Sequence, residues 1–256
     1  MFYAHRSDRF KFIMCTNGRC GSTLLKRWYL AIHDKDLPVL GDHNSVHSAL
    51  PYEDKSLHVA RDGFNDHPYF KFVVVRNPWE RLVSFYKVWV VGNQSNHEGL
   101  GRACSFTALI EQIEKEGPKD ASVFPQFEGL EGLRFNKMVY LEDVQSGMKE
   151  VCQACNIKFD PSQFSERVFP APVLEGKPIK NIHAATGHKI VESGHWPEWQ
   201  KFYTNDLRDR VSKIYAKDIA AMGYGWPRLD GPVERPQPQK PAAPKGSTKN
   251  RRPLRR

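Results

Sequence analysis

Apolar runs and amphipathic segments alternate along the first 231 residues of the chain. Three apolar runs have the length and composition of buried strands, and they span residues 10–15, 70–75 and 137–141. Other segments place apolar residues at helical spacing, which predicts helices over 22–33, from 78 onwards, and over 106–116, 142–155 and 206–222. This alternation predicts an α/β fold: a three-layer domain with a central parallel sheet flanked by helices.

The composition changes after residue 231. Residues 232–256 are rich in Pro, Lys and Arg and contain almost nothing that a core could bury, which is typical of disordered segments. Eight basic residues and one acidic residue give this segment a net charge of +7, which leaves +2 for the rest of the chain. We therefore expect one domain over 1–231 and a disordered, basic, Pro-rich tail over 232–256. A nucleic-acid-binding module based on the tail is a further hypothesis, which the nearly neutral body disfavours.

Nothing in the sequence indicates a membrane or a metal. The chain has no run of about 18 apolar residues, so we expect no transmembrane helix. The N-terminal residues carry charges where a signal peptide has its apolar stretch, which favours a soluble, cytoplasmic protein. Five scattered cysteines do not form a disulfide framework. The C-x-x-C pair Cys152 and Cys155 has no second pair of metal ligands, so we interpret both as buried or half-buried thiols.

The first candidate site is the segment Thr16–Thr23, which links the first predicted strand to the first predicted helix. Such a loop points backbone N–H groups at a ligand above the helix N-terminus. Its glycines allow close approach, Ser22 and Thr23 add hydroxyl groups, and Arg19 adds a permanent positive charge. The segment predicts a cradle for a phosphate-like anion, although a turn that only caps the helix explains the same residues.

A second candidate site follows the strand over 70–75. Arg76 stands at its carboxyl end, where ligands bind in open α/β sheets, and Ser84 lies two turns into the next helix, so both can reach one phosphate. We interpret Arg81 as solvated or ion-paired. The alternative is a P-loop nucleotide kinase, which needs a lysine after the last glycine of the loop and a carboxylate for magnesium. Here Ser22 directly follows Gly21, and Arg76 replaces the carboxylate.

The two segments resemble the 5′-phosphosulfate loop and the 3′-phosphate motif of sulfotransferases that use 3′-phosphoadenosine 5′-phosphosulfate (PAPS). The run VVVRNPWERLVSFY over 73–86 is similar to the R-x-P-x-E-R-L-V-S-x-Y pattern of the carbohydrate sulfotransferases of the chondroitin 4-O and HNK-1 branch. The first loop shares with that branch Arg19, the small residues after it, Thr23 and the pair Lys26–Arg27. The resemblance spans about residues 10–225, with its strong motifs in the first ninety.

The resemblance implies a P-loop-like fold and an enzyme that uses PAPS as co-substrate, releases 3′-phosphoadenosine 5′-phosphate (PAP) and requires no metal. The acceptor would be a hydroxyl or amine of a small molecule, as in secondary metabolism, or of a saccharide. Arg19 would be the catalytic cation, and Arg76 and Ser84 would hold the 3′-phosphate. The 5′-phosphosulfate would lie on Arg19, Cys20, Gly21, Ser22 and Thr23.

Transfer to a hydroxyl or amine also requires a general base. Relatives often carry a histidine between the two motifs, where this chain has His43 and His47. We expect His43 to be the base and His47 to be the second candidate, with a histidine on the polar surface as the alternative. Glu53 and Asp54 are further candidates, and His195 is expected in the acceptor pocket or in a turn. The acceptor pocket is expected from residues 43–66, 92–104 and 116–134.

Overall fold

The computed structural model describes residues 3–36, 43–50, 59–91, 104–164, 180–192 and 197–226. The chain divides into two units, Met1–Tyr224 and Gly225–Arg256, and the second has only its first two residues within the described ranges. The predicted tail over 232–256 lies outside the described residues and stays a prediction. In the described ranges, no helix is long and apolar enough to cross a lipid bilayer.

Four strands form one sheet in the order β1-β2-β3-β4. They are β1 Tyr3–Ser7, β2 Phe12–Thr16, β3 Phe70–Val75 and β4 Lys137–Tyr140. β2, β3 and β4 run parallel, with Phe12 beside Phe70 and Phe72 beside Lys137. β1 runs antiparallel to β2, so the sheet is mixed and the expectation of a wholly parallel sheet is wrong at this edge.

The first strand was not predicted because its sequence, YAHRS, has no apolar run. The turn over residues 8–11 is too short for a crossover, so the two strands that it joins must pair as an antiparallel hairpin. His5 and Ser7 are nevertheless buried, at 1% exposure each. This polar segment joins the sheet because of tertiary packing. The hydrophobic pattern of the sequence does not reveal such packing.

The longer helices lie where the periodicity predicts them, with differences at their ends. The helix that begins at Pro78 is α-helical to Phe85 and continues as a π-helix, η1, over Tyr86–Val91. The predicted helix over 206–222 is two helices that meet at Tyr215. The helices are α1 Ser22–Ile32, α2 His43–Ala49, α3 Arg61–Phe64, α4 Pro78–Phe85, α5 Phe106–Glu116, α6 Gln126–Leu130, α7 Val144–Ala154, α8 Gly187–Glu192, α9 Asn205–Ile214 and α10 Ala216–Met222. Short 3₁₀ turns span Leu141–Asp143, Pro161–Phe164, Ile182–Ala184 and Trp199–Phe202.

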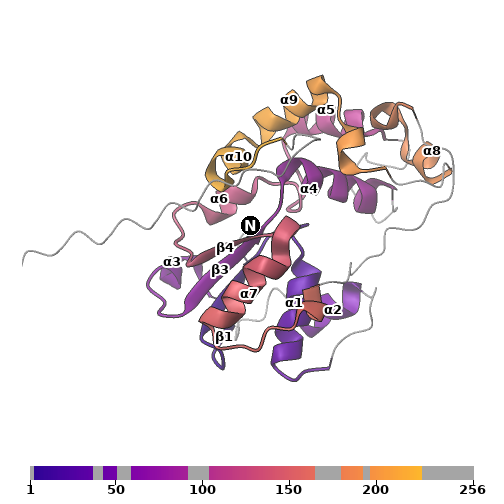
Figure 1. Ribbon diagram of the computed structural model, residues 1–256. Helices are drawn as coiled ribbons and strands as arrows, with labels where there is room; N and C mark the ends of the chain where they lie inside the picture. The colour runs from indigo at the N-terminus through magenta and orange to yellow at the C-terminus, as the bar shows by residue number, and fades with distance from the viewer. Residues whose placement is uncertain are drawn as a thin grey trace, which may run out of the picture. The chain divides into compact units, whose positions relative to one another are not determined.

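Alternate residues of the central strands face two separate cores. One core packs the sheet against α1 and α7, and the strand residues in it are Phe12, Met14, Phe72, Val74 and Val139. The other packs the opposite face against α3, α6 and α10, and its strand residues are Ala4, Ile13, Cys15, Val73 and Val75. These two groups of helices can be followed on either side of the sheet in Figure 1. Helices therefore cover both faces, which is why β2 and β3 are continuous apolar runs.

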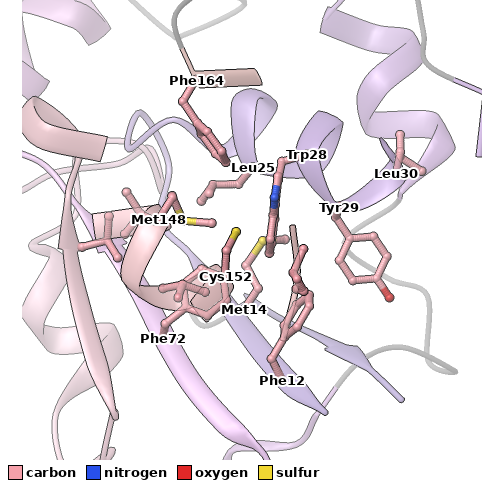
Figure 2. Packing of buried hydrophobic residues seen from close by; sticks show 14 of the residues in the cluster. Phe12, Met14, Leu25, Trp28, Tyr29, Leu30, Phe72, Met148, Cys152 and Phe164 are labelled. Carbon is pink, nitrogen blue, oxygen red and sulfur yellow. The ribbon is translucent and has the colours of Figure 1, made fainter. Parts of the chain in front are cut away.

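Trp28 of α1 lies at the centre of the first core. Its ring contacts those of Phe12, Phe72 and Phe164, with ring centroids 5.4, 6.0 and 6.3 Å apart. Figure 2 shows these rings packed together with Met148 and Cys152. Aromatic rings buried in this way contribute several kcal/mol each to stability. The cluster therefore anchors α1, and the loop that precedes it, against the sheet.

Gly147 lets α7 approach β4 closely, because a Cβ there would lie 2.6 Å from Cγ1 of Val139. Gly147→Ala should therefore lower the free energy of unfolding by about 1–3 kcal/mol through overpacking, although alanine favours helices. Chemical denaturation measures the change. The matched control is Gly63→Ala in α3, where a Cβ would meet no atom within 4 Å and the free energy should not fall.

The double variant Gly147→Ala/Val139→Ala tests the cause of this loss. If the methyl groups of Val139 are the obstacle, the effect of Gly147→Ala should shrink in the Val139→Ala background. Additive effects, or equal losses from Gly147→Ala and Gly63→Ala, would contradict a close approach of α7 to the sheet.

Candidate active site

The loop between β2 and α1 turns sharply at two left-handed residues, Arg19 with a φ of 63° and Gly21 with a φ of 78°. A non-glycine residue in this conformation is uncommon and is often found at functional sites. The N–H of Cys20 donates to the carbonyl of Asn17 over 3.2 Å. Gly21 has no room for a side chain, because a Cβ would lie 2.7 Å from Cδ1 of Leu141. The loop is thus bent back over the sheet, beside the residue that follows β4.

Several hydrogen-bond donors of this loop have no acceptor in the part of the chain that the structure describes. Asn17 Nδ2 and Arg19 Nε are buried and unpaired there. No described side chain caps α1 at Gly21, so the first N–H groups of the helix remain available at the positive end of its dipole. Buried donors without acceptors are unfavourable. A phosphate-like anion would supply the missing acceptors.

Asn77 begins α4 at the end of β3. Its side chain accepts hydrogen bonds from the N–H groups of Trp79, at 3.0 Å, and Glu80, at 3.2 Å. Pro78 occupies the first helical position, where no N–H is needed. The cap fixes the direction in which α4 leaves the sheet, and hence the position of Ser84 two turns later.

Arg19, Arg76 and Ser84, which the sequence places in two motifs, meet in one cluster. Arg19 Nη2 donates to Ser84 Oγ, at 3.0 Å, and to its carbonyl oxygen, at 3.3 Å. Arg76 Nη1 donates to the carbonyl of Arg19 over 3.2 Å. Arg76 Nη2 forms an ion pair with Glu80 over 2.9 Å. The two predicted phosphate sites are therefore in direct contact, and Arg19 belongs to both.

Positive charge is concentrated in this cluster. Burial, and then the charge of Arg76, lower the pKa of Arg19 to about 10, so the side chain remains charged at neutral pH. Arg81 adds a third guanidinium beside the loop. Glu80 is the one ion-pair partner of these three arginines within the described ranges. Three guanidinium groups beside the unpaired side-chain donors of the loop are suited to binding an anion, with Glu142 and Asp218 as acidic neighbours of Arg76 and Arg81.

The interpretation of Arg81 as solvated or ion-paired is wrong. Arg81 is 2% exposed and donates from Nε to the carbonyl of Gly18 and from Nη1 to that of Phe124, both over 2.8 Å. It ties the first loop to the segment before α6. The sequence gives no signal for this role, because both acceptors are backbone carbonyls far from Arg81 along the chain.

Gln126 is a second residue that the sequence analysis missed. Its side-chain oxygen accepts from the N–H of Arg76, at 3.0 Å, and from Cys20 Sγ, at 2.9 Å, and its nitrogen donates to the carbonyl of Arg76, at 2.8 Å. Burial raises the pKa of Cys20 to about 11, which keeps the thiol protonated as a donor. Buried Asp218 of α10 accepts from the N–H groups of Gln126 and Phe127, both at 2.8 Å. One amide therefore joins both loops of the site to α6.

His47 adjoins the first turn of α1. Its Nδ1 lies 3.0 Å from Lys26 Nζ, and its Nε2 lies 3.5 Å from Thr23 Oγ1. The second candidate for the general base is thus beside the loop. Other predicted positions lie outside the described residues, namely the side chain of His43, and Glu53, Asp54, His195 and residues 92–103.

The C-x-x-C pair lies away from this cluster, at the end of α7. Both cysteines are free; Cys152 is buried and Cys155 half-buried, as predicted. Burial raises the pKa of each to about 11, so neither is a reactive thiolate. Among the described residues, no group of three or more His, Cys, Asp or Glu is arranged to hold a metal ion.

Arg81→Met should lower the free energy of unfolding by about 2–4 kcal/mol, because two carbonyl oxygens inside the protein lose their donor. The matched control is Arg9→Met, which breaks an exposed ion pair with Asp34 and should change stability by less than about 1 kcal/mol. Chemical denaturation of both variants measures the difference. Equal losses would show that Arg81 does not hold the loop.

A comparison with models of protein families finds a match to the sulfotransferase family over residues 4–225. The match includes both loops of the cluster and every helix named above. No curated protein and no solved structure matches the chain. The family match covers most of the chain, so the assignment to the family does not depend on a single motif. The chain belongs to the sulfotransferase family and is a transferase.

Proposed function

We propose that this protein is a PAPS-dependent sulfotransferase that transfers the sulfuryl group to a hydroxyl or amine of a small molecule or saccharide. The observation that supports this most is the contact of Arg19 with both Ser84 and Arg76. PAPS has a 5′-phosphosulfate and a 3′-phosphate on one ribose, so it requires two anion sites side by side. A P-loop-like fold, with the phosphate loop between a strand and a helix, is part of the same proposal.

In this proposal, the 5′-phosphosulfate lies above the first turn of α1. The N–H groups there, together with the hydroxyls of Ser22 and Thr23, donate to its oxygens. Cys20 and Gly21 give the loop its shape. The unpaired donors Asn17 Nδ2 and Arg19 Nε support this placement, since the anion supplies the acceptors that they lack.

The 3′-phosphate lies on Arg76 and Ser84. Arg76 already points into the cluster through its contact with the Arg19 carbonyl, and its pair with Glu80 is an i,i+4 contact that a phosphate can replace. Arginine suits this role because its planar donors match two phosphate oxygens at once. Ser84 adds a hydroxyl from α4.

The reaction requires an acceptor atom in line with the sulfur and the bridging oxygen. The acceptor oxygen or nitrogen bonds to sulfur while the bond from sulfur to the bridging oxygen breaks, and PAP leaves. Arg19 stabilises the negative charge that develops on the bridging oxygen. The acceptor proton passes to a general base, for which His43 and His47 are the candidates.

Calorimetry with PAP tests the donor site. The intact protein should bind PAP, and Arg76→Ala should weaken binding about 10- to 100-fold, because a charged hydrogen-bond donor to the phosphate is lost. The control is Arg9→Ala, which removes an exposed arginine outside the cluster and should leave binding unchanged. Absence of PAP binding by the intact protein, or unchanged binding in Arg76→Ala, would refute the proposal.

Radiolabelled PAPS and a panel of phenols, amines and saccharides test the transfer step. At saturating PAPS, Arg19→Ala should reduce transfer about 100- to 1000-fold, since it removes the charge beside the bridging oxygen. Arg19→Lys should retain part of the rate because it keeps the charge. Transfer by Arg19→Ala at the wild-type rate would remove Arg19 from the reaction, while the panel itself identifies the acceptor class.

A further inference from the structure

Lys26 is a buried lysine to which the proposed chemistry assigns no role. It lies on α1 one turn after Thr23, and it is 0% exposed. Burial lowers the pKa of Lys26 to about 7, because a medium of low polarity disfavours the charged amine. A lysine in such surroundings requires hydrogen-bond partners, and these partners indicate what the residue does.

The amine of Lys26 contacts two groups in and next to α2. Nζ donates to the carbonyl of Leu50 over 2.6 Å and lies 3.0 Å from Nδ1 of His47. The first contact has the short length that is typical of a charged donor. In its charged form, which predominates below its pKa of about 7, the amine of Lys26 has donors only, so Nδ1 of His47 then accepts the second hydrogen bond. A neutral imidazole that accepts at Nδ1 carries its proton on Nε2.

The other ring nitrogen of His47 faces the start of α1. Nε2 lies 3.5 Å from Thr23 Oγ1, in the turn where the proposed phosphosulfate binds. With its proton on Nε2, His47 is a donor toward this hydroxyl and toward an anion beside it. The same proton prevents Nε2 from accepting the acceptor's proton as a general base.

We propose that Lys26 is a positioning residue that holds His47 in the neutral tautomer with its proton on Nε2, so that His47 donates to the phosphosulfate. The inference rests on the proposed function in one respect, the identity of the group that Nε2 meets. It changes the expected role of His47 from second candidate for the general base to a residue that binds the transferred group. The candidates for the base are then His43, which stays the first, and Glu53 and Asp54.

Nitrogen–proton NMR correlation of the full-length, nitrogen-15-labelled protein with saturating PAP reads the tautomer directly. His47→Gln identifies the signals of His47 among the ten histidines. In the wild type, Nε2 should be protonated and Nδ1 unprotonated. In Lys26→Met, the hydrogen bond from Lys26 to Nδ1 is lost and the ring should become a mixture of tautomers. Lys26→Arg should keep the Nε2 proton, and Lys217→Met, at an exposed lysine of α10, should change nothing.

A proton on Nδ1 in the wild type would overturn the proposal, and this measurement needs no variant of Lys26. Identical ring-nitrogen signals in the wild type and in Lys26→Met would overturn it as well. Calorimetry with PAP on the same samples separates this inference from the proposed function. A wild type that does not bind PAP would refute the PAPS site, whereas the tautomer of His47 alone decides the role of Lys26.

Discussion

The parallel run of β2, β3 and β4 is the constraint on which the site depends. Parallel neighbours end at the same edge of a sheet, so the Thr16–Gly21 loop, Arg76 and Leu141 are brought together although more than fifty residues separate each from the next. The two cores hold these strands between helices. Within the described ranges, the groups proposed to bind the anion are attached to that edge, either directly or through α1 and α4.

The cluster is assembled largely by neutral acceptors. Arg81 is held by the carbonyls of Gly18 and Phe124, and Arg19 by Ser84. Arg76 is held by the carbonyl of Arg19 and by one carboxylate, that of Glu80. Carbonyl oxygens satisfy guanidinium donors without neutralising their charge. The arginines are therefore fixed in place while most of their charge remains available to a ligand, which lowers the reorganisation that binding requires. Carboxylates in the same places would fix the arginines equally well but would neutralise their positive charge.

The sequence predicts the parts of the fold that a repeating pattern encodes. The buried strand over 70–75 and the helix over 106–116 lie at the predicted residues, because burial or amphipathicity is continuous along them. Arg19 and Arg76 were predicted as site residues because each follows a strand, and Ser84 because it lies two turns into the helix that begins after Arg76. β1, Arg81 and Gln126 were not found. β1 pairs with the edge of β2, and Arg81 and Gln126 bond backbone groups that are distant along the chain. A single sequence carries no local signal for such tertiary contacts.

Gln126 has a consequence for the rigidity of the site. The pairing of β3 with β2 ends at Val74, and its pairing with β4 ends at Val75. Arg76 is therefore the first residue of the chain beyond the paired part of β3. The primary amide of Gln126 bonds both the N–H and the carbonyl of Arg76, as a neighbouring strand does. The side chain of Gln126 thus extends the hydrogen bonding of the sheet by one residue, and this fixes the backbone that carries the guanidinium proposed to bind a phosphate.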